Sequence, residues 1–302
     1  MNITLIGYGE VGRILAEDLR KATHAVTAFD LKLSGDAGTA LRKHAAQYGV
    51  ALAPTHPDAV RVGELTICAV TASQTLAAAQ ACAQAMRPGS FYLDFNSASP
   101  GAKIAAAALI DTSGARYVEA AVMNSIPPPR IKVPLLLGGT HAQALLPLLQ
   151  SLGFVAQVAS AKLGVASATK MCRSVMIKGL EAMIIESFTT ARHYGVEDAV
   201  IASLHETFPT IDWEKQGAYM FQRVIEHGRR RAEEVREVAV TVREAGLEPF
   251  SAAGTAQRQA FIADLADGQV FGPRGTPDFA RSSDWRIEAD RLLTQIKTPH
   301  DV

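Results

Sequence analysis

Apolar and polar residues alternate along the first 160 residues in a way that predicts strands separated by helices. Short runs rich in β-branched residues are expected to form strands at residues 3–7, 25–30, 65–70, 90–96, 116–122, 134–138 and 154–159. The alanine-rich stretches between them are expected to form helices at residues 12–21, 37–48, 73–86, 100–109 and 141–152. Because strands joined by helices lie parallel, with right-handed crossovers, we predict a doubly wound, mostly parallel sheet.

After residue 160 the strand pattern stops and long stretches with helical spacing of apolar residues begin. We predict helices at residues 162–194, 196–206, 213–245, 256–266 and 284–296. Asp212 lies where a helix start is typical, and Gly195 and Gly246 lie where helices commonly end. Residues 270–277 are rich in glycine and proline and predict a loop. We therefore expect an α/β domain at residues 1–160 and an all-α domain for substrate binding and dimerisation at residues 161–302.

The charge of the chain is balanced, because 30 Lys and Arg residues oppose 30 Asp and Glu residues. No overall field would attract a polyanion, which argues against nucleic acid and against a membrane surface as partners. Cys68, Cys82 and Cys172 lack the spacing of a metal site and are expected to be free, buried thiols in a reducing compartment. Neither a signal peptide nor a membrane-spanning run is found, so we expect a soluble cytoplasmic protein with a small-molecule partner.

A glycine-rich motif directly follows the first predicted strand and opens the first predicted helix. It has the pattern GxGxxG and consists of Gly7, Tyr8, Gly9, Glu10, Val11 and Gly12. In such a motif the first glycine permits a tight turn, the second lets a pyrophosphate approach the backbone, and the third lets the helix pack on the strand. A glycine turn without a ligand would share the pattern, but the strand–helix context favours a Rossmann domain that binds a dinucleotide through these residues.

Asp30 ends the second predicted strand. A carboxylate at this place accepts hydrogen bonds from the adenosine ribose and repels a 2′-phosphate, so we expect NAD rather than NADP. Lys32 would partly neutralise that charge, which leaves NADP possible. Val70 and Thr71 end the next predicted strand and are expected to line the cofactor site, although a helix cap at Ser73 would explain the same segment.

One face of the predicted helix at residues 162–194 carries a polar stripe. Its members recur at spacings of three and four and are Ser167, Lys170, Ser174, Lys178 and Glu181. We expect the stripe to face a cleft, and a solvated edge would give the same periodicity. Oxidation of an alcohol needs a group that takes the hydroxyl proton. Lys170 is the candidate, because its helix begins where the cofactor domain ends and because burial beside Met171 and Cys172 would lower its pKa.

Three segments resemble the β-hydroxyacid dehydrogenase superfamily, which includes 3-hydroxyisobutyrate and 6-phosphogluconate dehydrogenases. Residues 7–19 are similar to its dinucleotide fingerprint, residues 94–100 to its substrate loop, and residues 164–170 to the glycine-rich run before its catalytic lysine. The resemblance covers nearly the whole chain, and it is closest to a branch of NAD(P)-dependent oxidoreductases with a related helical C-terminal domain. It implies that Lys170 is the general acid/base and that Asn96 and Ser97 contact substrate or nicotinamide.

Two segments depart from that family's pattern. Where the family has a second substrate loop of the type Asp-Ala-Pro-Val-Ser-Gly-Gly, this chain ends the segment in Asn124 and Ser125, before three prolines. Arg173 stands three residues after the lysine, where the family has Asn or His, and Ser174 follows it, where the family has Asn. Arginine holds a carboxylate or phosphate through two parallel hydrogen bonds. We therefore expect these four residues to bind an anionic substrate unlike the familiar ones, unless Arg173 pairs with Glu181 or another acid instead.

His227 lies in a long predicted helix whose charged residues are spaced four apart. Pairs of opposite charge at this spacing indicate a face of the helix that is exposed to solvent. The pairs are Glu226 with Arg230, Arg229 with Glu233, and Arg230 with Glu234. His227 and the glycine after it also resemble a signature of the branch named above, in which this half of one subunit can border the partner's active site. The resemblance implies a substrate role for His227 and a homodimer, which the apolar stripes on the long helices also favour.

Together these observations predict an NAD-dependent dehydrogenase that acts reversibly on the hydroxyl of a small, anionic 3-hydroxy acid or related alcohol. One alternative is an imine reductase of the same architecture, although such relatives generally lack a lysine at position 170. Another is a non-catalytic redox sensor that binds the dinucleotide. The altered loop at Asn124 and Ser125 would suit a sensor, whereas the retained Lys170 argues for catalysis.

Overall fold

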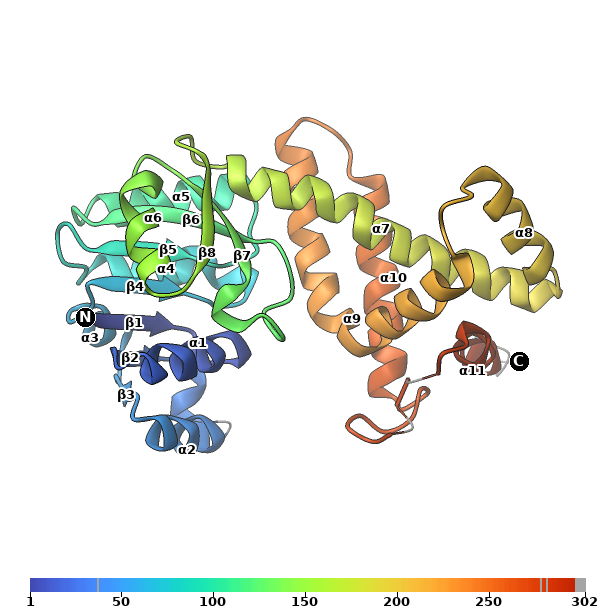
Figure 1. The fold of residues 1–302 in the computed structure, drawn as a ribbon, viewed down its shortest axis with the longest axis horizontal. Coiled ribbons are helices and arrows are strands. Elements are labelled where there is room, and N and C mark those ends of the chain that lie inside the picture. Colours follow the sequence, from blue (N-terminus) through green and yellow to red (C-terminus); the bar gives the residue numbers. More distant parts are fainter. Residues whose placement is uncertain (37, 278, 281, 297–302) are drawn as a thin grey trace, which may run out of the picture. The chain divides into compact units, whose positions relative to one another are not determined.

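The computed structural model describes residues 1–36, 38–277, 279–280 and 282–296 (Figure 1). The chain forms two compact units, Met1–Cys172 and Arg173–Val302. The expected assignment of residues 1–160 to the cofactor and of residues 161–302 to substrate and dimerisation stays a prediction.

The first unit contains one sheet, in the strand order β3-β2-β1-β4-β5-β6-β7-β8. Its strands are β1 (Asn2–Ile6), β2 (Ala25–Phe29), β3 (Ala51–Leu52), β4 (Leu65–Cys68), β5 (Phe91–Asp94), β6 (Arg116–Val122), β7 (Pro134–Gly138) and β8 (Val155–Ser160). Neighbouring strands are parallel except for β6 and β7, which pair antiparallel. The predicted doubly wound, mostly parallel sheet is confirmed. The short edge strand β3 was missed, because two residues carry no periodicity.

Helices cover both faces of this sheet and enclose two apolar cores. They are α1 (Glu10–Lys21), α2 (Gly38–Tyr48), α3 (His56–Val60), α4 (Thr75–Ala83), α5 (Pro100–Asp111) and α6 (Ala142–Ser151). Side chains of α1, α2 and α6 share one core with alternate strand residues such as Ile3 and Leu5. Side chains of α3, α4 and α5 share the other with Ile6. Successive side chains of β1 point to opposite faces of the sheet, so this strand contributes to both cores. Ala37, the first residue of one predicted helix, lies outside the described residues.

The second unit is helical, as predicted. The helix α7 (Val165–Tyr194) begins in the first unit, and the others are α8 (Glu197–Thr207), α9 (Trp213–Glu244), α10 (Phe250–Asp267) and α11 (Trp285–Ile296). Phe188, Phe221 and Trp285 form the aromatic centre of its core. The helix α10 begins at Phe250, six residues before the predicted start, because Pro249 opens it. Residues 270–277 form a loop, as expected.

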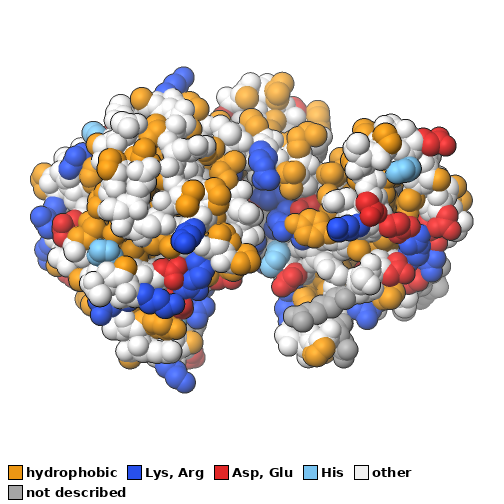
Figure 2. Space-filling model, viewed as in Figure 1, with side chains coloured by type: hydrophobic (Ala, Val, Ile, Leu, Met, Phe, Trp, Pro, Cys, Tyr) orange, Lys and Arg blue, Asp and Glu red, His pale blue; other side chains and the backbone are white. Residues whose placement is uncertain are grey.

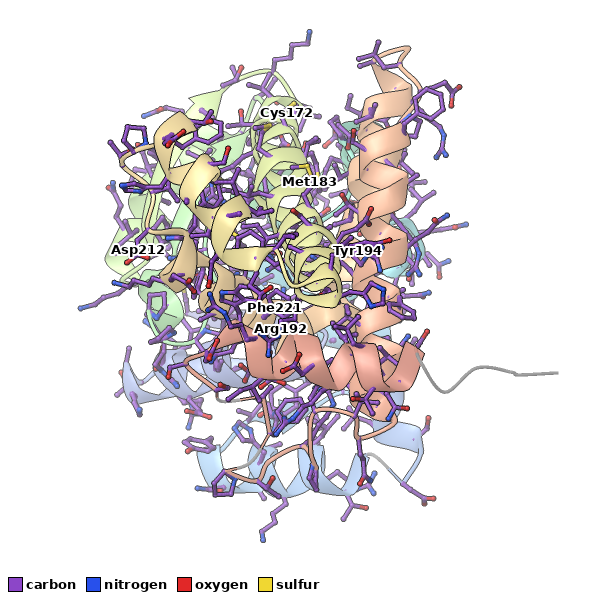
Figure 3. All side chains as sticks on the ribbon, turned by 90° about the vertical axis from the view of Figure 1, so that its right-hand side faces the viewer. Cys172, Met183, Arg192, Tyr194, Asp212 and Phe221 are labelled. Atoms are coloured by element: carbon purple, nitrogen blue, oxygen red, sulfur yellow. The ribbon has the colours of Figure 1, made fainter. Side chains whose placement is uncertain are left out.

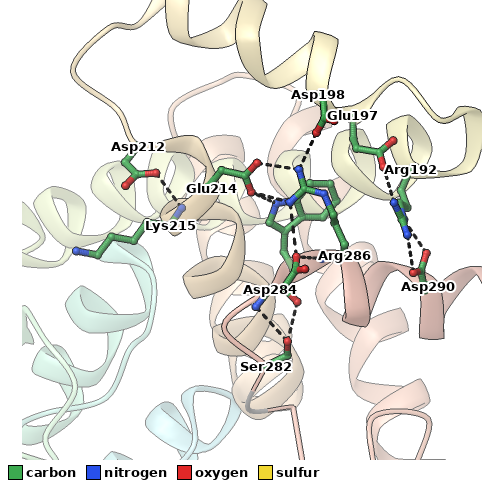
Figure 4. A network of polar contacts seen from close by, with 11 residues as sticks. Arg192, Glu197, Asp198, Asp212, Glu214, Lys215, Ser282, Asp284, Arg286 and Asp290 are labelled. Atoms are coloured by element: carbon green, nitrogen blue, oxygen red, sulfur yellow. Dashed lines mark hydrogen bonds and ion pairs between the residues drawn. The ribbon is translucent and has the colours of Figure 1, made fainter.

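Ion pairs tie the ends of these helices together at the surface of the helical unit. The guanidinium of Arg286 on α11 binds Glu214 on α9 and Asp198 on α8, and Arg192 on α7 binds Asp290 on α11 (Figure 4). Acidic and basic side chains accordingly adjoin on the visible face of this unit in Figure 2. These ion pairs join elements that lie far apart along the chain.

The polar stripe on α7 does not face water along its length, which corrects one expectation. In the helical unit Glu181 is 1% exposed and binds Arg231 on α9, and Lys178 donates a hydrogen bond of 2.6 Å to Glu234. Burial lowers the pKa of Lys178, although Glu234 opposes that shift. The C-terminal part of the stripe, Lys178 and Glu181, is thus buried between α7 and α9, because α9 supplies side chains of opposite charge.

The charges around His227 also pair differently from the prediction. Arg230 does bind Glu234 four residues on, but Arg229 reaches across to Asp264 and Asp267 on α10. A Cβ at Gly228 would lie 2.8 Å from the Gln259 carbonyl oxygen. The close approach of α9 and α10 at this glycine brings the acids of α10 within reach of Arg229.

Candidate active site

The candidate site lies at the edge where the parallel strands β1, β2, β4, β5 and β6 all end. The chain leaves β1 for β2 on one side, whereas β4 adjoins β1 on the other, so the strand order reverses between β1 and β4. Ligands of open α/β sheets bind at such a reversal, beyond the carboxyl ends of the strands. Gly7, Asp30, Val70, Asn96 and Asn124 each follow one of these strands closely.

The glycine motif has the geometry of a phosphate cradle. Gly7 has a φ of +94°, and a Cβ there would lie 2.3 Å from the Ala69 carbonyl oxygen. A Cβ at Gly12 would lie 2.1 Å from the Gly7 carbonyl oxygen, so α1 packs directly against the turn. At Gly9, the N-cap of α1, an added Cβ meets nothing within 4 Å, and no side chain caps the helix. The space over the first N–H groups of α1 fits a pyrophosphate.

Asp30 is fastened to the glycine motif. Its carboxylate accepts a 2.7 Å hydrogen bond from the backbone N–H of Tyr8 and one of 2.9 Å from the N–H of Lys32. The Tyr8 side chain is fully buried, where its hydroxyl contacts His44 at 2.8 Å, and burial raises its pKa to about 12. The Tyr8 side chain therefore faces the core rather than the surface of the glycine motif. Glu10 is exposed and Val11 half-buried at the start of α1.

Asn96 is buried and holds the neighbouring loop. Its amide oxygen accepts a 2.8 Å hydrogen bond from the N–H of Val70, and its amide nitrogen contacts the Cys68 sulfur. These bonds join the ends of β4 and β5 and leave the next residue, Thr71, exposed. A direct contact between Asn96 and substrate stays a prediction, whereas its contact with the Val70 backbone shapes the turn that carries Thr71.

A buried ion pair beneath this loop escaped the sequence analysis. Asp94 and Lys103 are 0% and 1% exposed, and their charged atoms lie 2.8 Å apart. The Asp94 carboxylate also accepts hydrogen bonds from the Tyr117 hydroxyl and from the backbone N–H of Asn96. The Asp-to-Pro loop motif pointed to Asp94, but nothing local distinguished Lys103 from a surface lysine. The pair braces the loop that bears Ser97.

Lys170 lies against that loop. Its amino group donates a 2.6 Å hydrogen bond to the hydroxyl of Ser97, within the first unit. Both side chains are half-buried. The neighbour Met171 is buried, but Cys172 is exposed, which corrects the expectation of three buried thiols and of an apolar contact from Cys172. Cys68 and Cys82 are buried, as expected.

The segment after β6 is anchored to α1. Asn124 is exposed, Ser125 is half-buried, and the N–H of Ser125 donates to the side chain of Asn124. Further on, the guanidinium of Arg130 binds both Glu17 and Asp18 of α1. Burial would raise the pKa of Glu17, but hydrogen bonds from His44 and Arg130 outweigh it and lower that pKa. Arg130 thereby connects this segment to the helix that follows the glycine motif.

The remaining candidates belong to the helical unit. Arg173 is exposed and Ser174 buried on α7. Among the described residues Glu181 pairs with Arg231 and Arg223, so the expected pairing of Arg173 with Glu181 is wrong, whereas its pairing with another acid stays an alternative. His227 is half-buried and lines a polar pocket together with Glu226. Burial lowers the pKa of His227. A contact of these residues with substrate stays a prediction.

Two family models match the chain. The NAD binding domain of 6-phosphogluconate dehydrogenase matches residues 2–158. A domain of unknown function, DUF1932, matches residues 191–262. The first match covers the sheet, the glycine motif and Asp30, and the second covers the helix that carries His227. Among the helices of the described residues, none is long and apolar enough to cross a bilayer.

Solved structures resemble the chain over most of its length. A conserved hypothetical protein from Sinorhizobium meliloti 1021 is 32% identical, covers 97% of each chain and has a TM-score of 0.76. A conserved protein of unknown function, described as structurally similar to 3-hydroxyacid dehydrogenases, is 27% identical over 88% of this chain and 98% of its own, with a TM-score of 0.70. The 3-hydroxyisobutyrate dehydrogenase of Mycobacterium tuberculosis, studied with L-serine, shares the fold at 17% identity, with a TM-score of 0.69 and coverage of 96% and 98%.

Proposed function

Because the chain belongs to the family of the NAD binding domain of 6-phosphogluconate dehydrogenase and is a dehydrogenase of that type, we propose that it uses NAD to oxidise a small, anionic 3-hydroxy acid reversibly. The observation that carries this proposal is the 2.6 Å contact between Lys170 and Ser97 at the carboxyl edge of the sheet. It sets a proton-transfer group beside the edge at which dinucleotides bind. Residues 1–160 would hold the cofactor, and residues 161–302 would complete the substrate site.

The glycine motif and Asp30 fit the dinucleotide. The open backbone N–H groups at Gly9 suit the pyrophosphate, and the carboxylate of Asp30 suits the ribose hydroxyls. When bound, the nicotinamide supplies the hydride acceptor. NAD is preferred in this proposal, because the negative charge of Asp30 opposes a 2′-phosphate.

The cofactor preference is tested with Asp30→Asn. The amide oxygen of Asn can still accept from the Tyr8 N–H, so the loop is kept while the charge is removed. We expect the ratio of kcat/KM for NAD to that for NADP to fall by about tenfold or more, because charge repulsion at a ribose phosphate is worth more than ~1.4 kcal/mol. A native enzyme that already prefers NADP would refute the assignment.

In the proposed reaction Lys170 takes the proton of the substrate hydroxyl and returns it in the reverse direction. The Ser97 hydroxyl, which accepts from Lys170, would orient the substrate oxygen toward the amino group. Arg173 would bind the carboxylate through paired hydrogen bonds. Asn96, Asn124, Ser125, Ser174 and His227 are the further residues proposed to shape the substrate site.

The experiment that tests this function measures NADH absorbance over a panel of 3-hydroxy acids, with the native protein, Lys170→Ala and the control Lys162→Ala. Lys162 is exposed just before α7. Loss of a general acid/base lowers kcat by about 10²–10⁴-fold, while NADH binding persists. Full activity of Lys170→Ala would refute the mechanism. Turnover only with imines or with carbonyls plus amines would favour an imine reductase, and tight NADH binding without any turnover would favour a redox sensor.

A homodimer is supported by apolar side chains on the outer face of α7. Met176, Met183 and Tyr194 are 72%, 61% and 72% exposed, and Figure 3 labels the last two along this helix. Stripes of this kind are usually covered in an oligomer. Sedimentation of the native protein and of Met183→Glu tests this proposal, because the charged variant should shift a dimer toward the monomer.

A further inference from the structure

Glu119 on β6 is a fully buried carboxylate with three donors from a distant segment. Its exposed fraction is 0%. One oxygen accepts hydrogen bonds of 2.8 Å from the N–H of Gly164 and 3.2 Å from the N–H of Ala166, and the other accepts 2.8 Å from the Ser167 hydroxyl. These donors are the first turn of α7 and the residue before it. Glu119 therefore caps α7 from the sheet, in place of a cap within the helix.

The surroundings of Glu119 are built for this contact. Gly138 lies opposite Glu119 in the antiparallel pair of β6 and β7, and a Cβ at Gly138 would lie 2.2 Å from the carboxylate oxygen. Gly164 has a φ of +88°, which turns its N–H toward the carboxylate at little steric cost. A Cβ at Gly164 would lie 3.3 Å from the Cβ of Pro100, so the turn also packs on the start of α5. The first turn of α7 is thus held between β6 and α5.

We propose that Glu119 is a positioning residue that fixes the rotation and axial position of the first turn of α7, and thereby holds the Lys170 amino group on Ser97. Lys170 follows Ser167 by three residues, so the two project from the same side of the helix, one turn apart. Release of the cap lets the helix start rotate or fray, and the amino group leaves the Ser97 hydroxyl. This inference rests on the proposed proton transfer by Lys170.

Isosteric and truncated variants separate positioning from charge. In Glu119→Gln the amide oxygen can accept from Gly164 and Ala166, while the amide nitrogen donates to the Ser167 hydroxyl, which already contacts the Gly164 carbonyl. We expect Glu119→Gln to keep kcat within about threefold. Glu119→Asp is one methylene too short, and Glu119→Ala has no acceptor. Both should lower kcat by about 10²-fold, as a displacement of about 1 Å does at an active site, with the Kd of NADH unchanged.

A double-mutant cycle shows whether the effect passes through Lys170. In the Lys170→Ala background Glu119→Asp should lower kcat by less than about twofold, because the group it positions is gone. Thr169→Ala is the control, since that residue is exposed and its hydroxyl donates a hydrogen bond within α7, to the Val165 carbonyl. The pH profile of kcat in Glu119→Asp should lose the limb that Lys170→Ala removes from the native profile.

Several results would overturn the inference. They are native kcat in Glu119→Asp, an equal loss in Glu119→Gln and Glu119→Ala, and the same fold-loss with and without Lys170. If Glu119→Ala does not fold, Glu119→Asp and Ser167→Ala, which removes one donor, decide the matter by the same criteria. Full activity of Lys170→Ala would instead refute the proposed function, whichever way the Glu119 variants behave.

Discussion

Gly9 and Gly12 differ in what an added methyl group would meet, and this difference separates stability of the fold from affinity for the dinucleotide. At Gly12 the Cβ would lie 2.1 Å from the oxygen and 3.0 Å from the carbon of the Gly7 carbonyl. Ordinary contacts begin at 3.4 Å, so the backbone of the motif must move by about 1 Å. We expect Gly12→Ala to cost about 1–3 kcal/mol, which lowers Tm by roughly 2–12 °C.

At Gly9 the same substitution meets open space. Its φ of −73° and ψ of −150° are accessible to alanine, and the loss as an N-cap is at most about 1 kcal/mol. The methyl group would, however, fill the space over the N–H groups at the start of α1. Losing two hydrogen bonds to a charged group, at about 1.5–3 kcal/mol each, raises the Kd of NADH by about 10²–10⁴-fold.

The assay compares thermal unfolding without cofactor and fluorescence titration with NADH for both variants. Gly254→Ala on α10 is the control, because its Cβ also meets nothing within 4 Å. The reasoning predicts a low Tm for Gly12→Ala and a near-native Tm with weak NADH binding for Gly9→Ala. Native NADH affinity in Gly9→Ala, or a Tm as low as that of Gly12→Ala, would refute it.

Three further predictions concern stability. Lys103→Met leaves the Asp94 carboxylate buried without its partner and should lower the free energy of unfolding by about 3–5 kcal/mol, measured in urea, with partial recovery when Asp94→Asn is added. Arg130 helps to lower the pKa of Glu17, so this carboxylate stabilises the fold above its ordinary pKa of 4.5 and loses that contribution as pH falls through the lowered value; Arg130→Met should therefore lose less stability between neutral pH and pH about 3 than the native protein does. Gly228→Ala should cost about 1–3 kcal/mol by forcing α9 and α10 apart, and an unchanged urea midpoint would contradict the close packing.

Local patterns predicted the elements of this fold and the glycine motif within them. After the exposed Asn2, every residue of β1 and β4 is buried, because both faces of a parallel sheet are covered by helices. An added Cβ would collide with backbone at Gly7 and Gly12 but would meet open space at Gly9. Such features are decided within a few residues of the chain, so the sequence exposes them directly.

The contacts that organise the candidate site were beyond the reach of local patterns. Glu119 meets Gly164 across 45 residues, and only the sheet order with its antiparallel β7 brings them together. The polar stripe on α7 was expected to face a cleft or water, but Glu181 found a buried partner in Arg231, 50 residues away. A polar side chain on a helix reveals that it needs a partner, whereas the choice between water and a distant charge depends on tertiary packing.

The clamp between Arg130 and the acids of α1 has a consequence for protein engineering. Asn124 and Ser125 belong to the proposed substrate site, and the segment that follows them is held to α1 by the ion pairs of Arg130 with Glu17 and Asp18. A segment transplanted from a relative that lacks this arginine would leave Glu17 and Asp18 without the ion pairs that Arg130 makes. Libraries aimed at new substrates should therefore vary this segment and these two acids as a single cassette.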